Sequence, residues 1–591
     1  MEYRGLKLDR FQAEAIEFIE SGHSVLVAAP TGTGKTLIAD YLIEHVLEGD
    51  GEIIYTAPVK ALSNQKYRQY VALYGREKVG LITGDLVINR DAPIRIMTTE
   101  ILRNILLEGG RVVPHEDLPD ESEGVSQSDI DFPVLDRLKA VIIDEIHFLD
   151  DPERGTVWEE LLIYLPSEIR ILGLSATLSN LEEFADWLSS IRKTEVQVVL
   201  ETNRTVPLEL RLASREPGLL GLEDYNQAFV RWKKEKKKEK KGKEDHGSSR
   251  GRRRGGRGGR RGSRGGGRGG GRGGAGREDA EKFTNHLDVI EMLPRTSFPA
   301  LYFIYSRKLV EVFATKLSMA RVSDRLGDFQ QAEAIDGHLD RFNKNHPHVL
   351  TPKLRKMYRK GIAFHHAGLH VGLKALVEEL YEAKLLSVLY CTSTFAMGIN
   401  MPARTVIFDS LTKFNGVEIV PLTVREFMQM AGRAGRRGID PVGQVVIRQD
   451  FGDYPEVQSL LKRLISNKSE PVVSSFNLSF HSVVNLVDRF EEDRIRYMLE
   501  QSFKAFQSVQ NAEALRLQIE RMQDAAASQS EEEFSVSRRK RREIAGMQRD
   551  LVEHERPRLL LLDITLPGMD GIELLRRARA LPGFAGLPAI A

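Results

Sequence analysis

Residues 29–36 read Ala-Pro-Thr-Gly-Thr-Gly-Lys-Thr, a spacing of glycine, lysine and threonine that can hold a polyphosphate. The glycines let successive backbone N–H groups turn toward a phosphate, and a helix that begins where the run ends adds the positive end of its dipole. Lys35 can then reach the β- and γ-phosphates, and the Thr36 hydroxyl can ligate Mg²⁺. The pattern predicts a site for ATP and Mg²⁺ whose residues are Ala29, Pro30, Thr31, Gly32, Thr33, Gly34, Lys35 and Thr36.

An acidic pair, Asp144 and Glu145, follows the apolar run Val141–Ile143. A buried strand that ends in acids places Asp144 at the carboxyl edge of a parallel sheet, where it can hold Mg²⁺. Glu145 is then left to polarise an attacking water. Alone, such a pair is ordinarily a solvated strand end; next to a phosphate-binding run, it predicts a catalytic site for hydrolysis.

The elements that must position these residues show as short Val/Ile/Leu-rich runs alternating with helix-length amphipathic stretches. This alternation is typical of parallel sheets with helical crossovers. It occurs twice, and it predicts an α/β fold with two parallel-sheet domains, over residues 1–205 and 285–470. The runs begin at Ser24, Glu52, Val141 and Ile171 in the first domain, and at Ala300, Leu386, Thr405 and Gly443 in the second.

The composition fits a multidomain globular protein. The chain has 591 residues, of which 41% are hydrophobic and 29% charged, and it shows no apolar run long enough to cross a bilayer. We expect no membrane partner and, from the first residues, no secretory signal. Cys391, the single cysteine, excludes an internal disulfide and falls at an apolar strand end, which favours a packing role. These features predict a reducing, cytoplasmic location.

A basic tract over residues 231–277 holds 20 Lys/Arg against 4 Asp/Glu, whereas the net charge of the whole chain is +1. Its Lys-rich and then Arg/Gly-rich sequence has no aliphatic side chains to bury, so we predict a disordered tract within a linker over 206–284. Such charge attracts nucleic acid by counterion release. The alternative is a solvated linker. A helical region over 471–555 and a final segment over 556–591 follow.

Asp144–His147 forms a DExH box, and with the motifs around it the chain resembles a superfamily-two nucleic-acid helicase over roughly residues 8–510. The resemblance implies two RecA-like domains that bind ATP and Mg²⁺ and move along a strand. Phe11-Gln12 resembles the Q motif, in which Gln12 reads adenine. The further motifs are Ala57–Leu62, Thr83–Asp85, Thr98–Glu100, Ser175–Thr177, Tyr305–Arg307, Thr392–Pro402 and Gln429–Gly438.

The resemblance also implies roles for single residues. Arg433 and Arg436, with Gln429, resemble the catalytic motif whose arginines stabilise the γ-phosphate charge. The residues that would grip the nucleic-acid backbone are Lys60, Thr99, Arg307, Thr392 and Thr394, and those that would couple hydrolysis to domain movement are His147, Ser175 and Thr177. His365 and His366 lack a Cys/His cluster, so zinc is not expected there.

Finer matches resemble the superkiller-type, exosome-associated RNA helicases. They lie in Arg154–Glu160, Gly361–Leu369, Asn477–Phe480 and Ser502–Gln507. This resemblance implies single-stranded or structured RNA as substrate and an RNA-degradation complex as partner. The Arg-Arg-Gly sequence that ends Gln429–Gly438 favours the RNA branch. A DNA helicase of the related repair branch stays as the alternative.

Residues Arg558–Leu575 resemble part of a response-regulator receiver, with Asp563 at the position of the phosphoacceptor. The acidic pair expected on an earlier strand is absent, so we expect poor Mg²⁺ binding and poor phosphotransfer at Asp563. A receiver-regulated RNA-binding scaffold is therefore a second alternative function.

Overall fold

The computed structural model describes residues 1–107, 137–152, 154–247, 283–395, 401–466, 468–476, 497 and 499–527. These residues form two compact units. The first comprises Met1–Ala29, Gly34–Glu201 and the described residues from Pro471 onward; the second comprises Thr202–Glu470 with the four residues Pro30–Thr33. No described helix combines the length and apolar character needed to cross a membrane.

The first unit is built on an eight-stranded sheet in the order β10-β3-β9-β8-β4-β7-β5-β6, parallel except for the β5–β6 pair. The central strands of this sheet are buried over most of their length, as expected of apolar runs without polar alternation. The strands are β3 (Ser24–Ala28), β4 (Glu52–Ala57), β5 (Val79–Thr83), β6 (Leu86–Ile88), β7 (Ile94–Thr98), β8 (Leu138–Ile143), β9 (Arg170–Ser175) and β10 (Val196–Leu200). A separate pair, β1 (Glu2–Tyr3) and β2 (Leu6–Lys7), precedes them.

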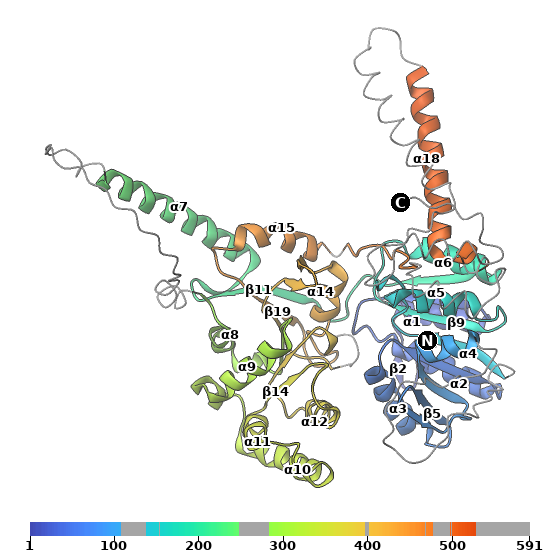
Figure 1. Ribbon diagram of the computed structural model, residues 1–591, viewed down its shortest axis with the longest axis horizontal. Coiled ribbons are helices and arrows are strands. Elements are labelled where there is room, and N and C mark those ends of the chain that lie inside the picture. Colours follow the sequence, from blue (N-terminus) through green and yellow to red (C-terminus); the bar gives the residue numbers. More distant parts are fainter. Residues whose placement is uncertain are drawn as a thin grey trace, which may run out of the picture. The chain divides into compact units, whose positions relative to one another are not determined.

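Helices cover both faces of this sheet, and alternate side chains of each strand enter two separate cores. Along β3, Val25 and Val27 pack into one core, and Leu26 and Ala28 into the other. The first core includes α1 (Arg10–Glu20), α2 (Thr36–Glu48) and α3 (Lys60–Tyr74). The second includes α4 (Thr99–Leu107), α5 (Gly155–Tyr164) and α6 (Leu181–Arg192). Figure 1 labels these elements.

The second unit contains a seven-stranded sheet in the order β12-β11-β19-β16-β13-β15-β14. Only the β11–β12 pair is antiparallel. Its strands are β11 (Leu208–Ser214), β12 (Gly218–Gly221), β13 (Ala300–Phe303), β14 (Ile362–His365), β15 (Val388–Cys391), β16 (Thr405–Phe408) and β19 (Gly443–Arg448). Cys391 is buried and unpaired, in keeping with a packing role. The predicted fold class, two parallel-sheet α/β domains, is confirmed.

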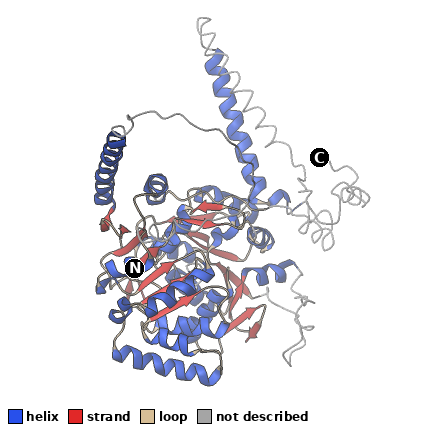
Figure 2. Cartoon of the chain, turned by 60° about the vertical axis from the view of Figure 1, so that its left-hand side comes forward, coloured by secondary structure: helices blue, strands red, loops and turns tan. Residues whose placement is uncertain are grey.

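Helices also alternate with the strands of the second unit along the chain, and Figure 2 colours the helices and strands of the structure separately. The α-helices of this unit are α7 (Leu222–Gly247), α8 (His286–Met292), α9 (Arg307–Met319), α10 (Phe329–Asn345), α11 (Pro352–Arg359), α12 (Val371–Glu382), α14 (Val424–Ala431) and α15 (Tyr454–Ile465). A short hairpin of β17 (Thr412–Phe414) and β18 (Ile419–Pro421) precedes α14.

The predicted linker over 206–284 needs correction, because its first part is folded. Strand β11 pairs in parallel with β19, and helix α7 continues through the lysine run to Gly247. Tyr225, Phe229 and Trp232 recur at helical spacing on α7 and pack on the core, which supplies the burial that the lysine run lacks. The Arg/Gly-rich part, residues 248–282, lies outside the described residues.

The chain after Glu470 returns to the first unit. Val472 and Phe503 belong to the core around α5 and α6, and Asn180 holds the backbone of Val472 through two hydrogen bonds of 2.7 and 2.9 Å. Helix α18 (Phe503–Ala527) begins at this contact (Figure 1). Of the predicted helical region 471–555, residues 471–476 are not helical; the receiver-like segment 556–591, with Asp563, lies outside the described residues.

Candidate active site

The glycine-rich loop connects the end of β3 to the start of α2, as the sequence predicts. Gly32 and Gly34 have φ angles of +86° and +92°, a backbone region that a Cβ atom disfavours, so both positions need glycine. The Thr33 hydroxyl donates to the carbonyl oxygen of Pro30 at 2.9 Å. Lys35 donates from Nζ to the carbonyl oxygen of Ala29, which folds its side chain back over the loop.

Gln12 touches this loop directly. It is buried in the first turn of α1, where its Oε1 accepts the Asp9 N–H at 2.9 Å in a capping box. Its Nε2 donates to the carbonyl oxygen of Gly34 at 3.0 Å. Gln12 therefore fixes the loop against the start of α1; its predicted contact with adenine stays a prediction.

Asp144 and Glu145 follow β8 at the carboxyl edge of the first sheet. The Asp144 N–H donates to Thr56 at 3.0 Å, which extends the β4–β8 ladder, and Asp144 Oδ1 accepts the N–H of Glu145 at 3.0 Å. Glu145 has a φ angle of +53°, an uncommon conformation for a residue with a Cβ. Such backbone strain is often kept where it aims a functional side chain.

His147 connects the acidic pair to the end of β9. Its ring is buried, and its Nδ1 lies 3.4 Å from the Ser175 hydroxyl and 3.5 Å from Glu145 Oε2. The N–H of Ala176 donates to the same nitrogen at 3.4 Å. The Ala29 N–H in turn donates to the Ser175 carbonyl at 3.2 Å. Three of the predicted motifs thus form one hydrogen-bonded unit; Thr177 follows it, half-buried.

Two residues next to the predicted metal ligands were not predicted from the sequence, namely Lys66 on α3 and Tyr55 on β4. The Tyr55 hydroxyl donates to Asp144 Oδ2 at 2.5 Å, and Lys66 Nζ donates to the Thr36 hydroxyl at 3.3 Å. Both side chains are buried. Since Thr36 and Asp144 offer the hard oxygen donors that Mg²⁺ prefers, the predicted metal residues fit the ion chemically.

The predicted strand-gripping residues of the first unit have different surroundings. Lys60 is exposed at the start of α3 and pairs with Asp85 at 2.6 Å, which joins two of the predicted motifs. Thr99 differs from its prediction, because its side chain is fully buried at the start of α4. Its hydroxyl has no hydrogen-bond partner among the described residues, and it is not accessible to a strand. Thr99 directly follows β7, and α4 packs into the core through Leu102 and Ile105, which leaves the Thr99 side chain buried.

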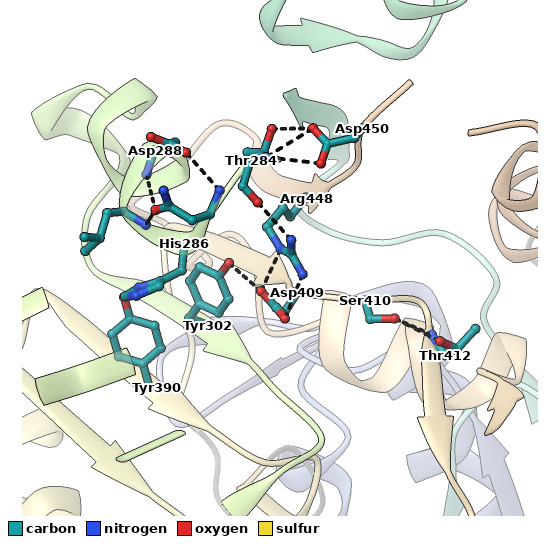
Figure 3. A network of polar contacts seen from close by, with 12 residues as sticks. Thr284, His286, Asp288, Tyr302, Tyr390, Asp409, Ser410, Thr412, Arg448 and Asp450 are labelled. Atoms are coloured by element: carbon teal, nitrogen blue, oxygen red, sulfur yellow. Dashed lines mark hydrogen bonds and ion pairs between the residues drawn. The ribbon is translucent and has the colours of Figure 1, made fainter. Parts of the chain in front are cut away.

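In the second unit, a polar network closes the carboxyl edge of the sheet (Figure 3). Arg448, the last residue of β19, donates to both oxygens of Asp409 at 2.8 and 3.0 Å, and Tyr302 donates to Asp409 at 2.9 Å. Arg448 also donates to the carbonyl of Thr284, whose N–H donates to Asp450 at 3.1 Å. The network ties the ends of β13, β16 and β19 to Thr284, which lies just before α8.

His286, beside this network, is a buried histidine that stays neutral (Figure 3). Its Nδ1 lies 2.9 Å from the Tyr390 hydroxyl, and its ring stacks on Phe313 with centroids 4.1 Å apart. Burial lowers the pKa of His286 to about 4, with smaller contributions from Lys316 and Arg448. At neutral pH His286 therefore has a packing and hydrogen-bonding role.

The predicted strand-gripping residues of this unit follow β13 and β15, which are neighbouring strands of the second sheet. Arg307 is exposed at the start of α9. Thr392 is buried and its hydroxyl lies 2.8 Å from that of exposed Thr394. His365 and His366 pair with different acids, Glu378 at 3.2 Å and Glu311 at 3.0 Å. Within the described ranges, no group of three or more His, Cys, Asp or Glu side chains could hold a metal ion.

The loop after α14 carries the predicted catalytic arginines. Gln429 and Arg433 are buried, and the Arg433 carbonyl accepts the N–H of Ala403 at 2.8 Å. Arg436 makes a two-pronged pair with Asp440, with Nε–Oδ2 at 2.7 Å and Nη2–Oδ1 at 2.9 Å. These hydrogen bonds raise the pKa of Arg436; burial raises the pKa of Asp440, but its bonds to Arg436 outweigh burial and lower it.

Arg204, a further residue that sequence reasoning missed, holds the backbone of this loop. Its guanidinium donates to the carbonyl oxygens of Val206, Gly432 and Ala434, each at 3.2 Å. Burial lowers the pKa of Arg204 to about 10, so it stays charged at neutral pH. Gly432 and Ala434 flank Arg433. Arg204 lies four positions before β11, and no local sequence pattern marks it as a residue that holds this loop.

Comparison with known families agrees with this arrangement. Residues 9–184 match the DEAD/DEAH box helicase family, and residues 339–438 match the helicase conserved C-terminal domain. The chain contains both domains of a DEAD/DEAH-box helicase. The first match covers the glycine-rich loop, the acidic pair and Ser175; the second covers Gln429, Arg433 and Arg436.

Relatives in several organisms share most of the chain. Probable helicase HelY of Mycobacterium tuberculosis is 34% identical over 87% of this chain and 53% of its own length. Exosome RNA helicase MTR4 of Homo sapiens is 34% identical over 85% of this chain and 44% of its own. Superkiller complex protein 2 of Homo sapiens is 35% identical over 86% of this chain and 38% of its own length. The chain is thus similar to helicases of the Ski2/MTR4 type, and it spans about half the length of the curated relatives it matches, or less.

Proposed function

We propose that this helicase is an ATP-dependent RNA helicase that couples ATP hydrolysis to translocation on RNA and to its unwinding. The observation that carries the proposal is the hydrogen-bonded unit at the carboxyl edge of the first sheet. There the ends of β3, β8 and β9 bring the glycine-rich loop, Asp144-Glu145, His147 and Ser175 together. Helicase-type hydrolysis needs these groups side by side.

When bound, ATP with Mg²⁺ supplies a phosphoryl group that can be transferred to water. The backbone N–H groups of the glycine-rich loop and Lys35 bind the phosphates, and Lys35 must leave its contact with Ala29 to do so. Thr36 and Asp144 hold the metal. Glu145, aimed by its left-handed backbone, orients the water and accepts its proton.

Coupling to movement rests on the contact between His147 and Ser175. The Nδ1 atom of His147 lies within 3.5 Å of Glu145, the Ser175 hydroxyl and the Ala176 N–H. A movement of Glu145 during hydrolysis therefore displaces His147 and, through it, the residues at the end of β9. Thr177 continues the same segment. In the second domain Arg433 and Arg436, with Gln429, stabilise charge on the transferred group.

RNA as the substrate is supported by the relatives, two of which are named as an RNA helicase of the exosome and as a superkiller complex protein. HelY is named only as a probable helicase. We propose single-stranded or structured RNA as the substrate, gripped through Lys60, Arg307, Thr392 and Thr394, and an RNA-degradation complex in the cytoplasm as the partner. A DNA helicase of the repair branch is the alternative, and regulation through Asp563 stays a prediction.

The experiment is strand displacement with four substrates of the same base sequence. They are RNA and DNA duplexes, each with either a 3′ or a 5′ single-stranded extension. We expect ATP-dependent displacement of the RNA duplex with the 3′ extension, and none in a Lys35→Ala variant. Preferential displacement of DNA supports the repair-branch alternative. Displacement that survives Lys35→Ala would mean that the glycine-rich loop does not power the reaction.

A further inference from the structure

Lys66 is a buried lysine at the back of the predicted metal site. It lies on α3, its side chain is only 6% exposed, and its Nζ donates to the Thr36 hydroxyl at 3.3 Å. The ammonium also lies 5.3 Å from the ring centroid of Tyr55 and 5.9 Å from that of Tyr70. Cation–π contacts of this kind stabilise a charge that has left water.

The same cluster holds both predicted metal ligands. Lys66 binds Thr36, and the Tyr55 hydroxyl binds Asp144. The rings of Tyr55 and Tyr70 meet edge to face with centroids 5.8 Å apart, which fixes the two contacts relative to each other. The buried cluster of Lys66, Tyr55 and Tyr70 therefore connects the Thr36 hydroxyl to the Asp144 carboxylate. Without this cluster, only a bound cation would connect the two groups.

The charges around Lys66 explain why a lysine can be buried here. Burial lowers the pKa of Lys66, whereas Asp144, Asp40 and Glu145 act on it in the opposite direction. Asp40 is itself buried; burial raises its pKa, and the charges of Lys66 and Arg4 lower it. In its ammonium form, Lys66 has these three acids as counter-charges.

The protein offers few ligands to a metal at this place. Thr36 and Asp144 supply one hydroxyl and one carboxylate, and no group of three or more metal-binding side chains occurs anywhere in the described part of the chain. Mg²⁺ prefers six oxygens and takes the remainder from water and substrate phosphates. Because the site has only two protein ligands, the positive charge of Lys66 beside it repels a divalent cation.

We propose that Lys66 is a resident cation of the metal site, which holds Thr36 directly and Asp144 through Tyr55, and which keeps free divalent metal out until nucleotide phosphates arrive. Lys66 is a positioning residue, since it acts through the two ligands. The inference rests on the proposed function, because it takes Thr36 and Asp144 as metal ligands. It adds that free metal does not bind before the nucleotide, so that the metal enters the site together with the nucleotide.

The test is binding of Mn²⁺ to the full chain without nucleotide, followed by the electron paramagnetic resonance signal of free Mn²⁺. Lys66→Met and Lys66→Gln remove the charge, and Lys66→Arg keeps it. Lys139→Met is the matched control, because Lys139 is an exposed lysine on β8, the strand that leads to Asp144. Near-ultraviolet circular dichroism shows which variants are folded.

Without nucleotide, we expect the neutral Lys66 variants to bind Mn²⁺ roughly tenfold more tightly than the wild type, because a nearby repulsion is removed. Lys66→Arg and Lys139→Met should bind as the wild type does. Equal or weaker binding by a folded neutral variant overturns the inference. So does wild-type protein that binds Mn²⁺ as tightly without ADP as with it, a result that needs no variant.

Parallel titrations with ADP separate this inference from the proposed function. If the wild type retains no Mn²⁺ even with ADP, the nucleotide site itself is wrongly assigned. If Mn²⁺ with ADP binds but the neutral variants gain nothing without ADP, only the role of Lys66 fails. Tyr55→Phe leaves the charge in place and should bind Mn²⁺ as the wild type does; tighter binding by this variant alone assigns the exclusion to the hydrogen bond on Asp144.

Discussion

Arg436 and Asp440 are joined by two parallel hydrogen bonds of 2.7 and 2.9 Å, one turn apart after α14. Arg404 approaches the same carboxylate at 3.6 Å. A planar guanidinium held at both prongs has a fixed direction, which a single contact does not give. The pair therefore decides where Arg436 points when nucleotide is present.

Replacing Asp440 with asparagine should loosen that direction while leaving the fold intact. We expect Asp440→Asn to lower the RNA-stimulated turnover number by roughly tenfold, which corresponds to about 1.4 kcal/mol of transition-state stabilisation. Asp453→Asn, at an exposed aspartate in the same domain, is the control and should behave as the wild type. Unchanged turnover in Asp440→Asn would remove Arg436 from the catalytic set.

Arg204 should matter to turnover although its contacts are to backbone atoms only. Lysine cannot reach three carbonyl oxygens with fixed geometry, so Arg204→Lys should lower the turnover number by roughly ten- to a hundredfold through displacement of Arg433. The KM for ATP should change much less. Arg211→Gln, which removes an arginine paired with Glu209 on the same strand, β11, serves as the matched control. An increase in the KM for ATP without a change in the turnover number would contradict a role in positioning Arg433.

Glu159 predicts a pH dependence of stability. Its carboxylate accepts the hydroxyl of Ser474 and the N–H of Phe503 at 2.8 Å, so it anchors the chain after Glu470 to α5. Burial, only partly offset by these hydrogen bonds, raises the pKa of Glu159 from 4.5 to about 7. The folded state thus holds the proton more tightly than the unfolded state. This stabilisation is fully present below about pH 4.5 and is lost as the pH rises through about 7.

Thermal unfolding of the wild type and of Glu159→Gln across this range provides the measurement. Relative to the neutral variant, the wild type should lose on the order of 3 kcal/mol between about pH 5 and pH 8. Glu182→Gln, at an exposed glutamate on α6, should show no such change relative to the wild type. A constant difference between the wild type and Glu159→Gln would show that Glu159 titrates normally.

Helix α7 offers a way to test the basic tract within described residues. Lys233 and Lys236 lie over the rings of Phe229 and Trp232, at 5.9 and 4.6 Å from their centroids, and support the packing of the helix. The variant should therefore leave them in place. Lys234, Lys237 and Lys238 are exposed and can be changed to glutamine together.

If this helix contacts RNA phosphates, the triple variant should bind RNA more weakly and with a shallower dependence on salt. Each lost phosphate contact lowers the slope of log K against log salt by about 0.7 for a single strand. A second triple variant, at Lys344, Lys353 and Lys356 on α10 and α11, controls for net charge. Equal losses in both would reduce the effect to total charge, which contradicts a specific tether.

The parts of this architecture that the sequence predicts are those set by local patterns. Apolar runs followed by a loop rich in proline and glycine, or by acids, fix the strand ends at Ala28 and Ile143, and therefore the places of Lys35, Asp144 and Glu145. Strand β11 escaped prediction because Glu209 and Arg211 interrupt its leucines, and only its pairing with the distant β19 makes it a strand. The role of Lys66 was not predicted for the same reason, because its burial depends on Tyr55 and Thr36, which belong to other elements.

The buried Thr99 is the converse case. A threonine that opens a helix after a strand resembles a capping or surface residue, and only the packing of α4 on the sheet shows its hydroxyl to be inaccessible. The side chains that hold other groups in place, Lys66, Arg204 and Glu159, share this property. Their partners are backbone or side-chain atoms far along the chain, so no local spacing reveals them.

The most direct test of the central claim is steady-state ATP hydrolysis with Mg²⁺, without polymer, with single-stranded RNA and with single-stranded DNA of the same sequence. The account predicts strong stimulation by RNA, and its loss in both Lys35→Ala and Glu145→Gln. Stimulation mainly by DNA would contradict the RNA assignment. Hydrolysis that no polymer stimulates, or that survives both substitutions, would contradict the proposal that this site powers a nucleic-acid motor.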